Sequence, residues 1–546
     1  GGTTRMRGKL NRPQLAALLA GLGRLGYPPR VESLTHNVGR WLDRHADIAG
    51  DRRALVDAER ELDYATLCDR TSRCAAALRD AGVARGDRVA ILLDNRSAYI
   101  EAVFAAARLG AIAVPINARF TVPEIQHILD DCTPRILIHE RTLSAQAEAA
   151  SGYSQLPPAR LIACGGSGDS YEAALSAARP LPDLEPVSPE DPMLLLYTSG
   201  TTGAPKGALL PHRKTLFNSL NAQLFFELTR SDRTLVPLPL FHSFGLLILA
   251  LPTLYTGGSV HLMSRFDPDE VWKVVDRERI TLLGGVPTMF RSLLEALQRE
   301  PAALLRRDSL RFMFTAGAAV SPELVLAFEK RNLVLKQGYG QTETSILCCL
   351  DARDAIRKAG SVGRAAFHVE LRVIDPETLS NPIEQWRDVA VGETGEIAVR
   401  GPITFLGYWN LPEATAETLR GDWVRTGDLA SVDEEGFVTL VARAREMYIS
   451  GGENVYPAEI ENVFAEHPAV REVAVIGIPH AKWGETGRAY VVPAEGADLD
   501  TGALLDWAGE RLARFKLPSE FVVVDSLPRT ASGKVQKHRL AEINSR

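Results

Sequence analysis

A short segment rich in Thr, Ser and Gly has the residue types of an anion-binding loop. It runs from Leu194 to His212 and reads LLLYTSGTTGAPKGALLPH. A largely apolar stretch, typical of a buried strand, is followed by hydroxyl side chains, glycines and Lys206. Glycines have no Cβ, so their backbone N–H groups can turn toward an anion, and the lysine adds a mobile positive charge. The pattern predicts a loop that holds a polyphosphate.

The loop differs from the Walker A motif GxxxxGK[ST] of P-loop nucleotidases. Gly203 follows Gly200 too early, Pro205 precedes Lys206, and neither Ser nor Thr follows the lysine. An ordinary P-loop NTPase is therefore excluded. A simple surface turn is the weaker alternative, because the hydroxyls, glycines and lysine gather directly behind an apolar stretch. We expect the loop to hold a triphosphate while that group is repositioned.

Further motifs follow this loop in a fixed order. They are LPLFHSFGL (238–246), AGAAVSPEL (316–324), GYGQTETS (338–345), GEIAVRG (395–401), WVRTGDLA (423–430), GGENVYPAEIE (451–461) and PRTASGK (528–534). Together with the loop, they resemble the adenylate-forming superfamily of acyl- and aryl-CoA synthetases, peptide-synthetase adenylation domains and luciferases. The pattern is most similar to bacterial fatty-acid and aryl-acid–CoA ligases, and the resemblance covers the chain from about residue 35 onward.

The resemblance implies a two-step reaction that uses ATP, Mg²⁺ and CoA. A carboxylate attacks the α-phosphate of ATP to give an acyl-adenylate and pyrophosphate, and a thiol then displaces AMP. The first step brings a carboxylate against a polyanion, so a metal ion, a lysine and backbone dipoles must offset the repulsion. The implied activity is an ATP-dependent carboxylic acid–CoA ligase, an AMP-forming acid–thiol ligase.

The resemblance also implies a nucleotide site built from several motifs. Tyr339 would stack on adenine, while Asp428 would bind the ribose hydroxyls with help from Arg443. Thr198 and Thr201 would touch the β- and γ-phosphates. The full set implied for ATP or AMP is Thr198, Ser199, Gly200, Thr201, Thr202, Gly203, Lys206, Gly317, Ala318, Ala319, Gly338, Tyr339, Gly340, Thr342, Asp428 and Arg443.

The residues implied in catalysis are Lys534, His242, Thr342 and Glu343. Lys534 would neutralise the transition state of the first step, and Thr342 would lie near the α-phosphate. Glu343 would bind Mg²⁺ together with Thr201, because a hard cation that bridges phosphates takes carboxylate and hydroxyl oxygens. His242 would lie beside the substrate carboxylate.

Each of these residues also has a structural alternative. His242 could be a core histidine, Glu343 an acid at a helix N-terminus, and Asp428 a turn residue. Lys534 could be a solvated surface lysine, which is how we interpret the nearby Lys537. The number and order of the motifs favour the functional interpretation in every case.

The segment ARAREMYISGGEN departs from the family pattern. Ala442 stands where Gly is usual, Arg445 takes the hinge position, and Tyr448 replaces the usual Ile or Leu. A hinge only needs to tolerate large backbone changes, so Arg445 is acceptable there. We hypothesise that a small domain rotates about Arg445 between half-reactions. The catalytic lysine would then leave, and Gly451 and Gly452 would approach to form the CoA channel.

The residues implied for the acid pocket are mostly apolar or aromatic: Phe241, His242, Phe244, Gly245, Val286, Gly338 and Ile346. Such a pocket suits a fatty acid or an aryl or arylalkyl acid. No carrier domain adjoins the motifs, so CoA is expected as the acceptor and a separate carrier protein is the alternative. A luciferase-like oxygenase and a non-catalytic binding homologue also remain open.

The elements that would position these residues alternate between helix and strand. Tyr64 to Ala81 predicts an amphipathic helix, while Asp87–Asn95 and Arg135–His139 predict buried strands. A second cycle of helices and strands follows the loop, and short strands with Gly-rich turns begin near residue 360. The expected fold is α/β: two α/β sheet subdomains and a small β subdomain form a large N-terminal domain. A small mobile α+β C-terminal domain follows.

We expect four parts along the chain: an N-terminal extension (1–34), a large adenylate-forming domain (35–442), a hinge (443–446) and a C-terminal lid domain (447–546). The net charge of −6 over 546 residues gives no basic surplus of the kind that nucleic-acid-binding proteins carry. No apolar run is long enough to span a membrane, and the six cysteines are scattered. We therefore expect a cytoplasmic enzyme that acts on small molecules, and a homodimer is one assembly that we consider.

Overall fold

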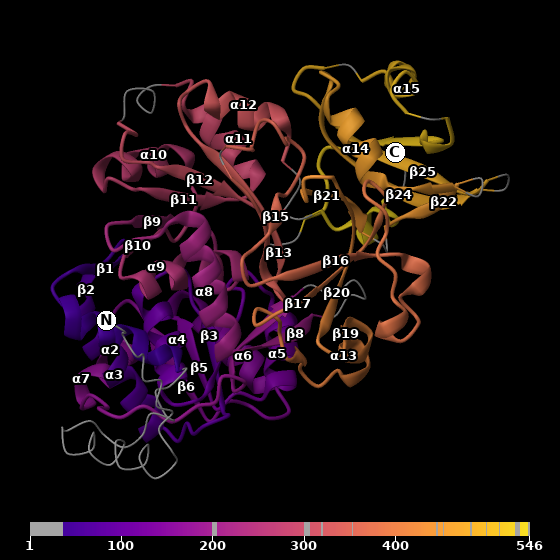
Figure 1. The fold of residues 1–546 in the computed structure, drawn as a ribbon. Helices are drawn as coiled ribbons and strands as arrows, with labels where there is room; N and C mark the ends of the chain where they lie inside the picture. The colour runs from indigo at the N-terminus through magenta and orange to yellow at the C-terminus, as the bar shows by residue number, and fades with distance from the viewer. Residues whose placement is uncertain are drawn as a thin grey trace, which may run out of the picture.

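The computed structural model describes residues 37–198, 205–299, 306–317, 320–351, 353–443, 446–450, 453–480, 483–497, 499–512, 514–529 and 535–543. Figure 1 shows the chain running from the indigo elements at the lower left to a yellow C-terminal unit at the upper right. Within the described ranges, no helix combines the length and apolar character needed to cross a membrane.

The first sheet has seven strands in the order β18-β8-β7-β4-β3-β5-β6. Its strands are β3 (Arg88–Leu92), β4 (Ile112–Pro115), β5 (Ile136–Glu140), β6 (Arg160–Cys164), β7 (Pro192–Thr198), β8 (Lys206–Pro211) and β18 (Gly407–Tyr408). Strands β3 to β7 pair in parallel, and β8 turns back antiparallel to β7. The helices of this region are α3 (Tyr64–Asp80), α4 (Ser97–Arg108), α5 (Val122–Cys132), α6 (Ser144–Tyr153) and α7 (Ser170–Ala177).

The second sheet has nine strands in the order β15-β14-β13-β12-β11-β9-β10-β1-β2. These are β1 (Arg53–Val56), β2 (Glu61–Asp63), β9 (Arg233–Val236), β10 (Ser259–Leu262), β11 (Leu282–Gly285), β12 (Phe312–Thr315), β13 (Leu335–Gln341), β14 (Ser345–Leu350) and β15 (Arg364–Ala365). Its helices are α2 (Trp41–Ala49), α8 (His212–Phe226), the π-helix η5 (Phe244–Ala250), α9 (Leu251–Thr256), α10 (Pro268–Arg277), α11 (Pro287–Ala296) and α12 (Pro322–Glu329).

A small antiparallel sheet follows, with β16 (Glu370–Ile374), β17 (Gly395–Arg400), β19 (Leu419–Arg420), β20 (Trp423–Val432) and β21 (Val438–Arg443), beside helix α13 (Pro412–Thr418). The C-terminal unit contains β22 (Tyr448–Ser450), β23 (Glu453–Val455), β24 (Val470–His480), β25 (Gly484–Pro493) and β26 (Glu520–Val523). Its helices are α14 (Pro457–Ala465), α15 (Thr501–Gly509) and α16 (Lys537–Leu540). Short 3₁₀ turns are η3 (Val38–Arg40), η4 (Arg141–Leu143), η7 (Pro376–Thr378), η8 (Ile383–Gln385) and η9 (Arg514–Lys516).

One continuous apolar core joins the two large sheets. It combines side chains of α3, α4, η5 and both sets of strands, and α4 is buried along its whole length. Helix α8 packs against η5 and β14 of the nine-stranded sheet and also against β8 of the seven-stranded sheet. Two sheets that share a core and a helix in this way have fixed relative positions, so the loops at their edges meet reproducibly.

The alternation expected from the sequence is confirmed. The predicted helix Tyr64–Ala81 is α3. Asp63 caps its N-terminus, because the Asp63 side chain accepts a hydrogen bond from the Thr66 backbone N–H. The predicted strands at 87–95 and 135–139 are β3 and β5. The α/β fold class, with a small β subdomain and a separate C-terminal domain, is confirmed.

One surface residue differs from its interpretation in the sequence. Lys537 is only 17% exposed, and its Nζ forms ion pairs with Glu446 at 2.8 Å and Glu461 at 2.7 Å. The expectation of a solvated lysine was wrong because two acidic side chains, distant in sequence, converge on it.

Candidate active site

A cavity of about 240 Å³ opens where the parallel strands of the two large sheets end. Its walls come from the segments that follow β3, β4, β9, β10, β11 and β12. The lining residues are Leu93, Asp94, Asn95, Ala118, Arg119, Pro237, Leu238, Pro239, Phe241, His242, Phe244, Ser264, Arg265, Phe266, Val286, Thr288, Met289 and Gly317. Open α/β sheets bind ligands at the carboxyl ends of their strands, so this is the expected position of a substrate site.

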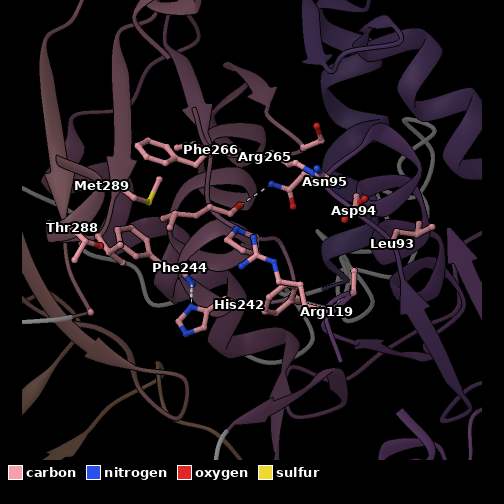
Figure 2. Close-up of a pocket in the computed structure, with 18 residues that line it drawn as sticks. Leu93, Asp94, Asn95, Arg119, His242, Phe244, Arg265, Phe266, Thr288 and Met289 are labelled. Carbon is pink, nitrogen blue, oxygen red and sulfur yellow. Dashed lines mark hydrogen bonds between the residues drawn. The ribbon is translucent and has the colours of Figure 1, made fainter. Parts of the chain in front are cut away.

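The cavity has an aromatic and aliphatic wall and a polar rim. Figure 2 shows Phe244, Phe266 and Met289 on one side and Asn95 and Arg119 on the other. Asn95 is part of the scaffold: its side-chain amide donates to the Leu238 and Met263 carbonyls and accepts from the Leu240 backbone N–H. A strand end of the first sheet thereby holds the loop that carries the aromatic wall.

Four of the predicted acid-pocket residues line the cavity: Phe241, His242, Phe244 and Val286. The other three are not in its lining. Gly245 is buried in η5, where a Cβ would come within 2.6 Å of the Pro239 carbonyl oxygen, and Gly338 packs against the ring of Phe314. Ile346 is buried in β14. The two glycines permit close packing of the elements that support the aromatic wall, and they do not contact the cavity themselves.

His242 is held at the start of the aromatic wall. Its Nδ1 accepts a hydrogen bond of 3.2 Å from the Phe244 backbone N–H, which Figure 2 shows as a dashed line. The next residue, Ser243, receives a hydrogen bond of 3.3 Å from the Thr342 hydroxyl. The structure therefore brings two predicted catalytic residues, His242 and Thr342, to the same place.

Asp428 lies at the centre of a buried polar cluster. Its Oδ2 accepts hydrogen bonds from the Tyr339 hydroxyl at 2.5 Å and from the Gln341 side-chain amide at 2.6 Å. Gln341 also donates to the Thr426 carbonyl at 2.8 Å, which holds the amide in place. Asp428 pairs with Arg443 across β20 and β21. The predicted adenine and ribose residues are thus neighbours, as one nucleoside site requires.

Glu343 occupies the turn between β13 and β14. One carboxylate oxygen accepts a 2.7 Å hydrogen bond from the Tyr408 hydroxyl, and the Glu343 carbonyl accepts from the Phe405 backbone N–H. The Lys206 ammonium lies 5.4 Å from the centre of the Tyr408 ring. Tyr408 therefore connects the Glu343 turn to the base of the predicted phosphate loop.

The surroundings of Glu343 fit a magnesium ion held mainly by phosphates. Mg²⁺ in nucleotide sites takes one or two protein carboxylates and completes its shell with phosphate oxygens and water. Glu343 supplies one half-buried carboxylate. Among the residues that the structure describes, no group of three His, Cys, Asp or Glu side chains could hold a metal by itself. Phosphate oxygens of a bound nucleotide would complete the shell of a metal at Glu343.

Comparisons with known proteins place this chain in a family. Residues 42–409 match the family model described as AMP-binding enzyme, and residues 459–534 match the AMP-binding enzyme C-terminal domain. The first of these matches covers more than half of the 546 residues. The chain belongs to the AMP-binding enzyme family. The resemblance drawn from the motifs is confirmed, and with it the class of an AMP-forming acid–thiol ligase.

Individual members of the AMP-binding enzyme family match along almost the whole chain. The feruloyl-CoA synthase of Amycolatopsis sp is 41% identical over 92% of this chain and 97% of its own length. The indoleacetate–CoA ligase of Aromatoleum aromaticum is 41% identical over 93% of this chain and 98% of its own length. The crystal structure of ATP-bound MatB from Rhodopseudomonas palustris superposes with a TM-score of 0.85 at 32% identity, covering 93% of this chain and 99% of MatB.

Some residues predicted from the family motifs lie outside the described residues. They are Ser199, Gly200, Thr201, Thr202, Gly203, Ala318, Ala319, Arg445, Gly451, Gly452 and Lys534. The two ends of the phosphate loop are described: Thr198 pairs with Lys206 across β7 and β8. The loop therefore leaves and re-enters the same sheet edge.

Sequence reasoning missed several side chains that support the candidate site. Gln341 bonds to Asp428, Ser243 to Thr342, and Tyr408 to Glu343. Gln341 and Ser243 lie inside quoted motifs, so their position was a usable signal. Tyr408 lies outside them, and only the pairing of β18 with β8 brings it to the site. Gly340 has a packing role, since a Cβ there would overlap the Ser345 carbonyl oxygen at 1.8 Å.

Proposed function

We propose that this ligase joins an aryl or arylalkyl carboxylic acid to coenzyme A, with the aromatic group bound in the cavity beside His242. The cavity of about 240 Å³ and its Phe241, Phe244 and Phe266 side chains support this proposal. Flat aromatic groups gain most from such walls, because ring pairs add to the burial of apolar area. Two relatives at 41% identity are named for feruloyl and indoleacetate, which are both aromatic.

The single observation that carries the proposal is the aromatic wall of a cavity of limited size, about 240 Å³. Figure 2 shows Phe266 and Met289 at the end farther from His242, and Ser264, Arg265 and Thr288 are polar members of the lining. A long alkyl chain would extend beyond this aromatic wall, at the cost of leaving apolar surface exposed. A shorter aromatic acid would keep its ring against this wall, and polar ring substituents could meet the polar lining residues.

In the first half-reaction, an oxygen of the substrate carboxylate attacks the α-phosphorus of ATP, and pyrophosphate leaves with the broken P–O bond. His242 and Gly317 would border the carboxylate, while Asp428 would hold the ribose. Glu343 and Thr201 would hold Mg²⁺, which supplies charge neutralisation between the phosphates when bound. Lys534 would bring a further positive charge to the α-phosphate.

In the second half-reaction, the CoA thiolate attacks the acyl carbonyl, and the carbonyl–oxygen bond to AMP breaks. We propose that the C-terminal domain moves about Arg445 between the two steps. Gly451 and Gly452 would then border the pantetheine channel. CoA is our proposed acceptor, and a separate carrier protein would be distinguished by its own product.

An acid panel tests the proposal. Cinnamic, ferulic, phenylacetic and indole-3-acetic acids would be compared with octanoic and palmitic acids in the presence of ATP, Mg²⁺ and CoA. Pyrophosphate release and the thioester mass would be recorded for each acid. We expect at least one aromatic acid to exceed both fatty acids about tenfold or more in kcat/KM.

The other outcomes of the panel are equally definite. A preference for palmitate would overturn the aromatic assignment and leave the ligase class intact. AMP formation without a thioester would indicate a carrier protein as acceptor, and light emission with luciferin would indicate an oxygenase. ADP in place of AMP would overturn the mechanism itself.

A further inference from the structure

A lysine is buried between the two large sheets, outside the motifs discussed above. Lys214 is the third residue of α8 and has 0% of its surface exposed. Its Nζ donates hydrogen bonds to the Ser345 hydroxyl at 2.6 Å and to the Ile403 carbonyl at 2.7 Å. Ser345 belongs to β14, and Ile403 lies between β17 and β18. The lysine therefore joins α8 to two other parts of the chain.

The contact with Ser345 holds the turn that carries Thr342 and Glu343. Ser345 ends this turn with a φ of +58°, a left-handed conformation that costs free energy in a residue with a Cβ. The hydrogen bond from the Lys214 ammonium holds the Ser345 side chain in place. The backbone of the next residue, Ile346, donates a 3.2 Å hydrogen bond to Asn218, one helical turn after Lys214.

The contact with Ile403 holds a second segment, which donates hydrogen bonds to Glu343. In that segment, the Phe405 backbone N–H donates to the Glu343 carbonyl at 2.9 Å. The Tyr408 hydroxyl donates to the Glu343 carboxylate at 2.7 Å. Lys214 is therefore bonded both to the turn and to the segment that sets the Glu343 side-chain direction.

Helix α8 also holds the acid-pocket wall. The Asn218 side-chain amide donates a 2.5 Å hydrogen bond to the Leu247 carbonyl in η5, the helix that begins at Phe244. One face of α8 thus connects the turn that contains Glu343 with the wall that borders the acid. Two substrates that must meet at phosphorus need such a common support, because small misplacements cost large factors in rate.

A buried cation at this position is costly for stability. Burial lowers the pKa of Lys214 well below its ordinary value, mainly by desolvation, although the nearby Glu343 opposes the shift. The lysine also stands in the first turn of α8, where the helix dipole disfavours positive charge. Apolar residues of similar size commonly replace buried charges with no loss of stability. A stability role therefore does not account for the lysine.

We propose that Lys214 is a positioning residue for adenylation, which sets the Glu343–Ser345 turn for the magnesium–nucleotide complex through Ser345 and Ile403. This proposal rests on the proposed function of Glu343. It predicts that removal of the ammonium impairs the first half-reaction and metal-dependent nucleotide binding, without loss of the fold.

The test compares Lys214→Met with Thr215→Val. Met matches the length of the lysine stem without its charge. Thr215 is a buried neighbour on the same helix, and its hydroxyl has no hydrogen-bond partner among the residues that the structure describes. We expect Lys214→Met to lower the kcat of acid-dependent pyrophosphate–ATP exchange about 10- to 100-fold. The KM for the acid should stay within about twofold, and the thermal midpoint should not fall. Thr215→Val should match the wild type in all three.

A binding measurement adds a readout that needs no turnover. Calorimetry with ATP would be run in Mg²⁺ and again in EDTA. We expect Lys214→Met to weaken ATP binding about tenfold in Mg²⁺ and less than about twofold in EDTA, because only the metal complex uses Glu343. Equal losses under both conditions would show a general packing defect and overturn the proposal. So would exchange within twofold of wild type in a folded variant.

A second variant decides the case if Lys214→Met does not fold. Ser345→Gly keeps the lysine, removes the hydroxyl that it bonds, and suits the φ of +58°. We expect the same Mg²⁺-dependent loss of ATP affinity, and unchanged affinity would overturn the proposal. If the wild type exchanges pyrophosphate with no acid in the panel, the proposed function fails. The calorimetry would still decide the role of Lys214.

Discussion

The hydroxyl of Tyr339 lies 2.5 Å from Oδ2 of Asp428, although 89 positions separate the two residues in the chain. Gln341 approaches the same oxygen at 2.6 Å, so two donors converge on one buried carboxylate. The predicted adenine-stacking ring and the predicted ribose carboxylate therefore form a single unit. A change in either residue should alter nucleoside binding before it alters any chemical step.

Asp428→Asn should raise the KM for ATP about 10- to 100-fold, since an amide nitrogen in place of an oxygen would face the donors of Tyr339 or Gln341. Tyr339→Phe loses one hydrogen bond and should raise the KM for ATP only about 3- to 10-fold. Steady-state kinetics with varied ATP, together with AMP affinity by calorimetry, checks both. An unchanged KM for ATP in Asp428→Asn would remove Asp428 from the nucleotide site.

Lys534→Ala should reduce acid-dependent pyrophosphate–ATP exchange at least about 100-fold, because the positive charge expected at the α-phosphate is lost. Thioester formation from a supplied acyl-adenylate should change less than about threefold, since that step follows the transfer of the adenylyl group. Arg539→Ala, at an exposed position nearby, is the control and should leave both rates unchanged. Full exchange in Lys534→Ala would disprove the assignment.

Arg445→Pro should have the opposite pattern. Proline restricts φ at the expected hinge, so the domain rotation that precedes thioester formation should slow. We expect the thioester rate to fall about tenfold or more while pyrophosphate–ATP exchange stays within about threefold. Rapid-quench measurement of each half-reaction gives the two rates. Equal losses in both would argue against a hinge at this position.

Val286→Phe should narrow the acid cavity beside Gly317. A Cβ on Gly317 would stand 3.8 Å from Val286, and both residues line the cavity, so a larger side chain at 286 intrudes into it. We expect kcat/KM for cinnamic or indole-3-acetic acid to fall about 30-fold, with propanoic acid as the internal control that changes little. If both acids lose activity equally, Val286 supports the fold and does not select the acid.

His261 should make stability depend on pH. It is 2% exposed in β10, and burial lowers its pKa to about 4 from an ordinary value of 6.5. Above pH 6.5 the ring is neutral in both the folded and the unfolded chain, so it has no effect. As the pH falls from 6.5 toward 4, the unfolded chain binds a proton that the folded chain does not, and folded stability decreases by up to about 3 kcal/mol.

Replacing His261 removes this loss. His261→Phe should show a shallower fall of the thermal midpoint between pH 7 and pH 4.5 than the wild type. His127→Gln, at an exposed position, should follow the wild type. Scanning calorimetry at several pH values checks this, and parallel curves for His261→Phe and the wild type would contradict the prediction.

Much of the fold could be predicted because its signals are local. The helix α3 and the strands β3 and β5 follow from short-range hydrophobic patterns in the windows that they occupy. The prediction that Lys537 is solvent-exposed was wrong because its contacts are not local in the sequence. Its partners Glu446 and Glu461 come from segments far along the chain, and a window of sequence contains no information on them.

The residue types of the site could be read from the motifs, but the supporting contacts could not. Tyr408 and Lys214 lie in no motif that we recognised, and both reach the Glu343 turn through tertiary contacts. The hinge, the CoA channel and the role of Lys534 stay predictions. They depend on residues outside the described part of the chain.

The sequence by itself determined the reaction class, because hydroxyls, glycines, carboxylates and a lysine in a fixed order specify a chemistry for joining two anions. It also determined the alternation of helix and strand, which arises from local periodicity. Only the tertiary structure decided which side chains meet: the Tyr339–Asp428 unit, the aromatic cavity between two sheets and the buried Lys214. Contacts of this kind depend on how the sheets and α8 pack together, and packing is a property of the whole chain.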